Sequence, residues 1–390
     1  MTPSARVQAA IELLDEVIAS TASDGAPADA LVQRYFKTRR YAGSKDRRAV
    51  RELVFRAIRA IGERPASGRA AMLALEDPEI AAQFNGSPHG PAELVPGEHV
   101  AEARLLPRWI EPRLSRLVGS EEWPALLERA PLCLRVNVAR GNRQSIAPAF
   151  PEATLTRLSP WGLCLPSDSR ITETPEFTEG LVEVQDEGSQ LIALACGARP
   201  GMTIVDLCAG AGGKALALAA MAPEARIIAC DTNRDRLSQL APRADRAGAV
   251  IETRLLDGGR EAEQLADLAG LADVVLVDAP CSGSGTWRRN PEGRWRLTPE
   301  RLARLVALQD YLLGLAAPLV RPGGALVYAT CSVIEAEGAG QGRNFLGRHS
   351  SWIGQEPAFE GGRVDAPGRL LTPGHDATDG FFVACFQAPC

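Results

Sequence analysis

From residue 201 onward, short apolar, β-branched runs alternate with segments in which apolar residues recur every three or four positions. The first pattern predicts buried strands and the second predicts amphipathic helices. Alternation of this kind over ~190 residues indicates an α/β fold with a doubly wound, mainly parallel sheet. The expected strands are Thr203–Leu207, Ala225–Cys230, Ile251–Leu255, 273–277, Ala325–Tyr328 and Gly380–Phe386, and the expected helices are 213–222, 233–247, 260–268 and 299–319.

The first 200 residues follow other patterns. Helical spacing over 4–22, 29–36 and 47–61 predicts a small all-α domain, and a Pro/Gly-rich stretch over 76–100 predicts a linker. Short helices are expected over 106–118 and 121–129, and strand-like segments over 132–138, 153–166 and 179–185. We therefore expect four segments: a helical domain (1–75), a linker with helical segments (76–128), a small α/β subdomain (129–180) and the large α/β domain (181–390).

Composition narrows the class of protein. The chain has 390 residues, 45% of them hydrophobic and 23% charged, which is ordinary for a soluble protein. No apolar run approaches the ~18 residues of a membrane span, and the N-terminus lacks the apolar centre of a signal peptide. These features predict a cytoplasmic protein. The nine cysteines show no Cys-x-x-Cys spacing, so we expect reduced thiols and no metal site.

The charges are unevenly distributed. The net charge is −5, yet the stretch from Arg34 to Arg59 has ten basic residues against two acidic ones, with four aromatic residues between them. A solvated helix face is the usual explanation of such a run. Here the one-sided excess favours contact with a polyanion.

A glycine-rich turn follows the first strand of the large domain and opens a helix. It reads Asp206-Leu-Cys-Ala-Gly-Ala-Gly-Gly-Lys214, so bare amides and a helix N-terminus can meet a ligand there. The spacing also matches a dinucleotide fingerprint, which leaves a nicotinamide-dependent oxidoreductase as a rival. Carboxylates at successive strand ends suit the ribose, amine and sulfonium of S-adenosylmethionine better than an anionic pyrophosphate. The expected cofactor-binding residues are Cys208, Ala209, Gly210, Ala211, Gly212, Gly213, Lys214, Asp231, Asp257 and Asp278.

Two cysteines stand at the carboxyl ends of the fourth and fifth expected strands. The first ends in Asp278-Ala-Pro-Cys281 and the second in Thr330-Cys331-Ser332. Taken alone, Cys281 is as well explained by an inert buried thiol. Because these strands are neighbours in this class of fold, we expect the two thiols to meet across one crevice.

These two motifs resemble those of the Sun/RsmB family of RNA cytosine-5 methyltransferases, in its bacterial ribosomal-RNA branch. The likeness extends over residues 105–390, and the first helices more loosely resemble a NusB-like RNA-binding domain. Further matching segments are Val184–Gln190, Asp206–Lys214, Arg288–Pro291 and Asp379–Phe382. Departures are Ala209-Gly210-Ala211, where Ala-Ala-Pro is common, and Glu337-Gly338, where Glu-Asn is usual.

The resemblance implies a Rossmann-like class I methyltransferase that uses S-adenosylmethionine on RNA, with 16S ribosomal RNA as the expected substrate, no membrane or metal, and a monomeric state. It also implies roles for three residues. Cys331 would attack carbon 6 of cytosine, Cys281 would remove the proton from carbon 5, and Asp278 would bind the base. Lys214 would either lie near the cofactor or base, or cap its turn.

The loop Trp287-Arg288-Arg289 combines an indole with two guanidinium groups. Such a loop can hold phosphates and stack on unpaired bases, so all three residues are candidate substrate contacts. A loop packed by its own Trp side chains is the alternative. A cytosine in a duplex would have to be flipped out, so unpaired RNA is the expected target.

Two further readings stay open. The chain could be a DNA cytosine-5 methyltransferase, in which Cys281 would be the nucleophile. It could also be a catalytically idle RNA-binding factor in ribosome assembly.

Overall fold

A computed structural model describes residues 1–23 and 25–390, and the chain divides into two compact units. The helical unit comprises 1–114, 123–128 and 286–301, and the α/β unit comprises 115–122, 129–285 and 302–390. This division differs from the four expected segments in two ways. The helical unit takes in the loop 286–301, and the small sheet belongs to the same unit as the large one.

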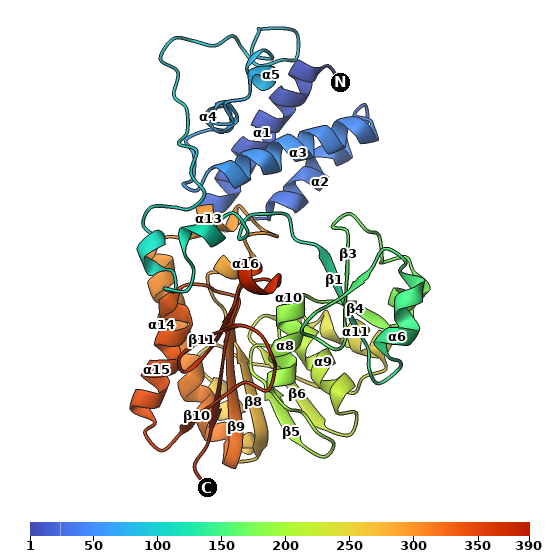
Figure 1. The fold of residues 1–390 in the computed structure, drawn as a ribbon, viewed down its shortest axis with the longest axis vertical. Helices are drawn as coiled ribbons and strands as arrows, with labels where there is room; N and C mark the ends of the chain where they lie inside the picture. Colours follow the sequence, from blue (N-terminus) through green and yellow to red (C-terminus); the bar gives the residue numbers. More distant parts are fainter. Residues whose placement is uncertain (24) are drawn as a thin grey trace. The chain divides into compact units, whose positions relative to one another are not determined.

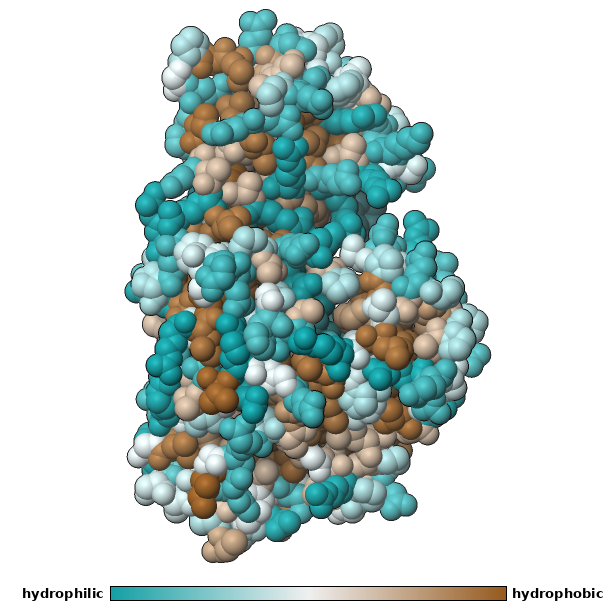
Figure 2. Space-filling model, in the orientation of Figure 1, coloured by the Kyte–Doolittle hydropathy of each residue, from teal (hydrophilic) through white to brown (hydrophobic). Residues whose placement is uncertain are grey.

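The helical unit is built on α1 (Pro3–Ala22), α2 (Ala28–Thr38) and α3 (Ser44–Ala60), which confirm the first three expected helices (Figure 1). Thr2 caps α1 by accepting a hydrogen bond from the Ala5 amide (3.2 Å), and Pro3 occupies the first helical position. The buried faces of the three helices form one apolar core. Figure 2 shows hydrophilic residues over the end of this unit where α2 leads into α3. Short helices complete it: α4 (Gly68–Leu73), α5 (Pro78–Ala81) and α13 (Gly293–Arg296).

The helices expected over 106–118 and 121–129 were wrong. Those segments form only 3₁₀ turns at Glu111–Arg113 and Ser120–Glu122. Pro107, Pro112 and Pro124 fall within or beside them. Because proline has no amide hydrogen to donate, it interrupts a helix that apolar spacing alone would predict.

The large sheet of the α/β unit confirms the expected fold class. Its five parallel strands are β5 (Thr203–Asp206), β6 (Arg226–Asp231), β7 (Glu252–Leu255), β8 (Ala272–Asp278) and β9 (Val320–Thr330). The strand order is β11-β12-β13-β9-β8-β5-β6-β7, with β10 pairing β13. The antiparallel strands are β10 (Ile353–Gln355), β11 (Arg363–Asp365), β12 (Gly368–Leu371) and β13 (Phe381–Gln387).

Helices cover both faces of this sheet, which explains why its strands read as unbroken apolar runs. The apolar core on one face joins alternate strand residues such as Val274 and Leu276 to α8 (Glu187–Ala195), α9 (Gly213–Met221), α10 (Arg234–Leu237) and α11 (Leu240–Ala247). Helices α14 (Pro299–Ala316) and α15 (Ala339–Arg348) lie on the other side (Figure 1), as does α12 (Glu261–Gln264), whose Glu261 accepts from Tyr311 of α14.

The segment Pro299–Leu319 is long and apolar enough to cross a membrane by length and composition alone. Its apolar side chains are instead used for packing, because Leu302, Leu312, Leu313, Leu315 and Ala316 are all buried. The helix therefore matches a core helix of an α/β domain.

A second, four-stranded sheet has the order β2-β3-β1-β4 and is antiparallel throughout. Its strands are β1 (Leu132–Val136), β2 (Thr154–Leu155), β3 (Gly162–Leu165) and β4 (Val182–Val184), accompanied by α6 (Arg143–Ile146) and α7 (Pro175–Thr178). Cys133 and Cys164 face each other on β1 and β3 with their Cα atoms 4.2 Å apart, and they form a disulfide. The expectation that the cysteines are reduced was wrong for this pair, because the strand register that joins them cannot be read from their spacing. The other seven are free thiols.

Candidate active site

The glycine-rich turn joins β5 to α9, and two of its glycines are required by its shape. Gly210 and Gly212 have φ of +55° and +80°, in the left-handed region. A Cβ at Gly212 would lie 2.1 Å from Leu240 Cδ1. Asp231, at the end of β6, holds the turn by accepting from the Gly210 amide (2.7 Å). The first turn of α9 has no side-chain cap, so its amides remain available to a ligand.

Asp206, the last residue of β5, has an unusual environment. It is 1% exposed, and within the described part of the chain neither of its carboxylate oxygens has a hydrogen-bond partner. Burial, and after it the charge of the neighbouring Asp278, raise the pKa of Asp206 to a net value of about 7. A buried carboxyl group without a partner is costly on its own, so the site suits a cationic ligand group that would complete it.

Asp278 ends β8, and its Oδ2 accepts a hydrogen bond from Lys214 Nζ at 2.6 Å. Burial by itself lowers the pKa of Lys214, but the Asp278 carboxylate outweighs it and leaves that pKa above the ordinary value. The ammonium also lies 5.8 Å from the centre of the Phe381 ring. The structure thus pairs Lys214 with the candidate base-binding carboxylate, and Phe381 is a neighbour that the sequence analysis did not single out.

The two candidate catalytic cysteines meet. Strands β8 and β9 are paired, with Asp278 opposite Ala329, so the loops after them leave the sheet side by side. Cys281 Sγ and Cys331 Sγ are 3.3 Å apart, and both residues are partly exposed. The hydrogen bond with Cys331 raises the pKa of Cys281 well above that of an ordinary thiol, and burial raises it further. Cys281 therefore keeps its proton at neutral pH.

The remaining acidic candidate, Asp257, lies two residues beyond β7 and is exposed. Its Oδ2 accepts from Gln264 Nε2 at 3.1 Å. Cys208, Ala209, Ala211 and Gly213 lie on the turn itself, all partly exposed. Within residues 1–23 and 25–390, no group of three or more His, Cys, Asp or Glu side chains is placed to hold a metal ion. The exclusion of a metal stays a prediction.

The loop with Trp287, Arg288 and Arg289 belongs to the helical unit. Trp287 is 1% exposed, so its indole does not offer a face to a base in this conformation. Trp295 lies in the helical core and donates its Nε1 hydrogen to Ile61 O (2.9 Å). This burial favours the alternative weighed above, a loop packed by its own Trp side chains, and the stacking role of Trp287 stays a prediction. Arg288 and Arg289 remain candidate contacts.

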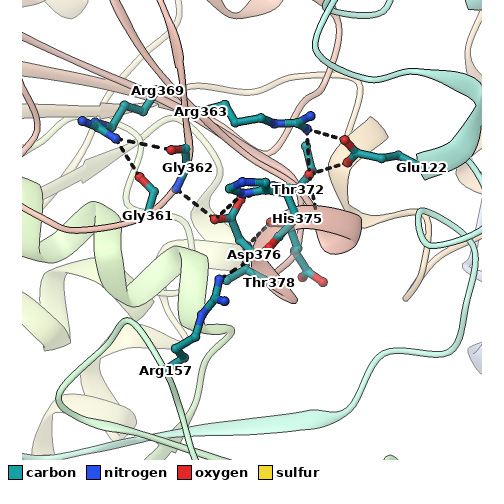
Figure 3. A network of polar contacts seen from close by, with 11 residues as sticks. Glu122, Arg157, Gly361, Gly362, Arg363, Arg369, Thr372, His375, Asp376 and Thr378 are labelled. Atoms are coloured by element: carbon teal, nitrogen blue, oxygen red, sulfur yellow. Dashed lines mark hydrogen bonds and ion pairs between the residues drawn. The ribbon is translucent and has the colours of Figure 1, made fainter.

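A network of polar contacts anchors the segment before the Asp379–Phe382 motif (Figure 3). Asp376 is buried in α16 (Pro373–Asp376) and accepts from the amides of Gly362 (2.9 Å) and Thr372 (3.0 Å). Glu122 accepts from Thr372 Oγ1 and pairs with Arg363, each at 2.5 Å. The anchored chain then reaches Gly380, whose amide donates to the carbonyl of Gly285 (2.8 Å) in the loop that carries Cys281.

Comparison with known proteins identifies this arrangement. Residues 193–387 match the family model described as 16S rRNA methyltransferase RsmB/F. A Synechocystis protein named "Probable ribosomal RNA small subunit methyltransferase B" is 34% identical over 300 residues, which cover 73% of this chain and 67% of that protein. This chain belongs to the RsmB/F methyltransferase family.

Two solved structures agree with the fold of an RsmB/F methyltransferase. The crystal structure of PH0851 has a TM-score of 0.76 at 23% identity and covers 99% of both chains. NSun6 from Pyrococcus horikoshii, solved with SFG, has a TM-score of 0.64 at 18% identity, covering 72% of this chain and 98% of that one. The Rossmann-like methyltransferase fold and the family expected from the sequence are confirmed.

The structure also brings to this site a residue to which the sequence analysis gave no role. Glu337, in the 3₁₀ turn Glu335–Glu337, is fully buried and accepts hydrogen bonds from the loops that carry both cysteines. From the sequence, Glu337 was named only within the departure Glu337-Gly338, and nothing in the sequence shows that its side chain turns inward.

Proposed function

We propose that this RNA methyltransferase transfers a methyl group from S-adenosylmethionine to carbon 5 of a cytosine in RNA, with small-subunit ribosomal RNA as the substrate. The observation that carries the proposal is the 3.3 Å pair of sulfurs, Cys281 and Cys331, at the ends of adjacent strands. Carbon 5 of cytosine is a poor nucleophile until a group adds to carbon 6. A thiolate can both add there and leave again, so one thiol suits addition and the other suits release.

The residues of the turn fit S-adenosylmethionine. The unpartnered carboxyl group of Asp206 suits the ammonium of the methionine part, and the open amides of α9 can approach its carboxylate. Asp231 ends β6 and Asp257 lies just beyond β7, where their carboxylates could accept hydrogen bonds from ribose hydroxyls and an adenine amine. A fold neighbour solved with SFG, an analogue of S-adenosylmethionine, supports this cofactor. When bound, the cofactor supplies an electrophilic methyl group on its sulfonium.

The coupled thiols give the two cysteines different roles. Two thiolates 3.3 Å apart repel each other, so only one of them ionises easily. The likeness to the family's motifs assigns the attack on carbon 6 to Cys331, and the raised pKa of Cys281 agrees with that sulfur keeping its proton at this stage. Once the Cys331 sulfur is bonded to carbon, its charge is gone and Cys281 can ionise. After the proton of Cys281 has passed to solvent and carbon 5 has been methylated, the Cys281 thiolate takes the proton from carbon 5. The bond between Cys331 and carbon 6 then breaks and returns the Cys331 thiolate.

Asp278 and Lys214 would orient the base. Lys214 Nζ donates to Oδ2 of Asp278 (2.6 Å), which would leave Oδ1 to accept from the exocyclic amine of cytosine. The Lys214 ammonium, beside the same base edge, favours the negative charge that develops on the ring after the thiolate adds.

Contact with RNA is proposed for the turn between α2 and α3. Several arginines of the basic run are neutralised: Arg39 pairs with Glu12, Arg51 with Asp29 and Arg56 with Asp77. Lys37, Arg40 and Lys45 are exposed, and no ion pair is found for them within residues 1–23 and 25–390. Tyr41 stands among them, 73% exposed, as a stacking surface for an unpaired base. We further propose that the protein acts in the cytoplasm as a monomer.

The activity is tested with purified protein, labelled S-adenosylmethionine and small-subunit ribosomal RNA. Nuclease digestion should yield labelled 5-methylcytidine with the wild type and none with Cys331→Ser. Bisulfite sequencing of ribosomal RNA from cells with and without the gene then locates the cytosine. Label in another nucleoside, or methylation of DNA cytosine and not of RNA, would refute the proposal. Absence of both cofactor binding and label would favour the idle assembly factor.

A further inference from the structure

Glu337 is buried at the point where the two cysteine loops meet, with a relative exposure of 0%. Its Oε1 accepts from the Ser282 amide (2.8 Å) and from Gln309 Nε2 (3.0 Å). Its Oε2 accepts from Ser332 Oγ (2.6 Å) and from Ser282 Oγ. Ser282 follows Cys281 directly and Ser332 follows Cys331 directly. One carboxylate therefore holds the neighbour of each catalytic cysteine.

The hydrogen bonds of the serine hydroxyls around Glu337 leave few alternative positions for their protons. Ser332 Oγ accepts from the Ile334 amide (3.0 Å), and Ser284 Oγ accepts from the Val333 amide (2.9 Å). Ser284 and Ser332 are themselves 2.9 Å apart. Each hydroxyl has one proton to donate, and those of Ser282 and Ser332 go to Glu337. The hydroxyls of Ser282 and Ser332 thus both donate to Oε2 of Glu337.

The far side of Glu337 is also fixed. Gln309 of α14 donates both to Glu337 Oε1 and to the carbonyl of Pro280 (2.9 Å), which precedes Cys281. Tyr328 of β9 donates to the backbone carbonyl of Glu337 (2.7 Å). The carboxylate of Glu337 is therefore tied to α14 and its backbone to β9, so both limit how far the residue can move with either cysteine loop.

We propose that Glu337 is a positioning residue that sets the distance between the Cys281 and Cys331 sulfurs through Ser282 and Ser332. Its effect on catalysis rests on the function proposed above; its effect on the sulfurs does not. A carboxamide has the same shape, but its NH₂ group cannot accept. In Glu337→Gln, one of the two accepting oxygens becomes an NH₂ group. The hydrogen bonds to that atom are lost, and one cysteine loop is held less tightly than the other.

The test compares Glu337→Gln with Glu335→Gln, a matched control in the same turn whose carboxylate is partly exposed and pairs with Arg343. Because a misplacement of ~1 Å can cost ~100-fold in rate, we expect Glu337→Gln to lower kcat for RNA methylation by ~10- to 100-fold. KM for RNA and the Kd of S-adenosylmethionine should stay within about twofold, since neither ligand touches Glu337. Glu335→Gln should match the wild type in all three constants.

A second measurement needs no methylation. Diamide takes one hydrogen from each of two nearby thiols and leaves a disulfide, and peptide mapping by mass spectrometry follows the bond between Cys281 and Cys331. The wild type and Glu335→Gln should form it at one rate, and Glu337→Gln should form it ~10-fold more slowly, in proportion to lost proximity. Should Glu337→Gln not fold, Ser332→Ala removes one link while keeping the carboxylate and should show the same two effects at smaller size.

The possible outcomes distinguish the positioning role of Glu337 from the proposed methylation of cytosine. Wild-type kcat and cross-linking rate in Glu337→Gln would overturn the inference and leave the proposed function intact. A slower cross-link in a protein that does not methylate cytosine would support the positioning of the sulfurs and refute the proposed function. A loss confined to KM for RNA would show that Glu337 acts on substrate binding, which would also overturn the inference.

Discussion

At the scale of single residues, two identical side chains acquire different roles because they are coupled. Cys281 and Cys331 lie 3.3 Å apart, and the hydrogen bond between them raises the pKa of Cys281. A cysteine alone in either loop would be an ordinary, partly exposed thiol. The pair allows only one negative charge at a time, which orders attack before proton removal.

This assignment predicts the behaviour of RNA that carries 5-fluorocytidine. Fluorine at carbon 5 cannot leave as a proton does, so the adduct with the attacking sulfur persists. We expect Cys281→Ser to retain the covalent adduct, with turnover on ordinary RNA lowered by ~100-fold or more, because the base is lost and the nucleophile is kept. Cys331→Ser should form none. Denaturing gel shift with labelled RNA measures both, and Cys390→Ser, an exposed thiol, is the control.

The opposite pattern would reverse the roles. If Cys281→Ser abolishes the adduct and Cys331→Ser still traps it, the site works as in a DNA cytosine-5 enzyme. Loss of the adduct in both variants, with folding intact, would mean that neither sulfur acts without its neighbour.

Asp206 leads to a prediction about proton release when S-adenosylmethionine binds. Its pKa of about 7 means that the free protein holds this carboxyl group partly protonated at neutral pH. A ligand ammonium placed beside it favours the charged form and lowers that pKa, so binding of S-adenosylmethionine should release close to half a proton at pH 7. Affinity should therefore rise with pH up to about 7 and then level off. Calorimetric titration in two buffers of different ionisation enthalpy measures the release.

Asp206→Asn should abolish the release, while Asp245→Asn, on the exposed side of α11, should leave it unchanged. Release that persists in Asp206→Asn would place the titrating group elsewhere and contradict the fit proposed for the cofactor.

At the scale of elements, the site depends on a close approach of two backbones. A Cβ at Gly285 would lie 1.9 Å from the carbonyl oxygen of Gly380, which neither loop can accommodate without moving. We expect Gly285→Ala to lower the free energy of unfolding by about 1–3 kcal/mol and to reduce kcat, because the displaced chain carries Cys281. Gly314→Ala is the matched control: Gly314 lies in α14 with no atom within 4 Å of the added methyl group.

Denaturant titration and methylation assays follow both variants. Gly314→Ala should stabilise the protein by up to about 1 kcal/mol through helix propensity and leave kcat unchanged. An unchanged kcat in Gly285→Ala would show that the Cys281 loop moves independently of β13.

The elements also show which patterns in the sequence predict structure. The parallel strands were predicted because both faces of β8 and β9 are buried, which makes their apolar runs unmistakable. That pattern, together with the rule that parallel strands end at one edge, was enough to bring Cys281 and Cys331 together. Strands β10 and β11 were missed because they are three residues long with mostly exposed side chains, and pairing with neighbours, not their own composition, makes them strands.

Glu337 and the disulfide were beyond such patterns for a related reason. The role of Glu337 depends on α14, β9 and two loops meeting, and the disulfide depends on the register of β1 against β3. Both are consequences of tertiary packing between segments far apart in the chain. The NusB-like likeness and the four expected segments stay predictions.

At the scale of the whole molecule, the chain must attract a polyanion although its net charge is −5. We propose that the helical unit achieves this by pairing several of its acidic residues locally. Glu12, Asp29 and Asp77 each bind an arginine of the basic run. The cations at the α2–α3 turn, Lys37, Arg40 and Lys45, are left to face solvent. Attraction then depends on where the unpaired charges stand and not on their sum.

The salt dependence of RNA binding tests this arrangement. Each phosphate contact with single-stranded RNA contributes about −0.7 to the slope of log K against log salt, so the triple variant Lys37→Gln, Arg40→Gln, Lys45→Gln should flatten the slope by about 2. Fluorescence anisotropy with an unpaired ribosomal-RNA fragment, at five or more salt concentrations, measures the slope. The control replaces Arg226, Arg260 and Arg348 by Gln, three cations of the α/β unit that already pair with carboxylates. It removes the same net charge, so an equal loss of slope in the control would mean that RNA senses the charge of the whole protein and would refute a localised contact at the α2–α3 turn.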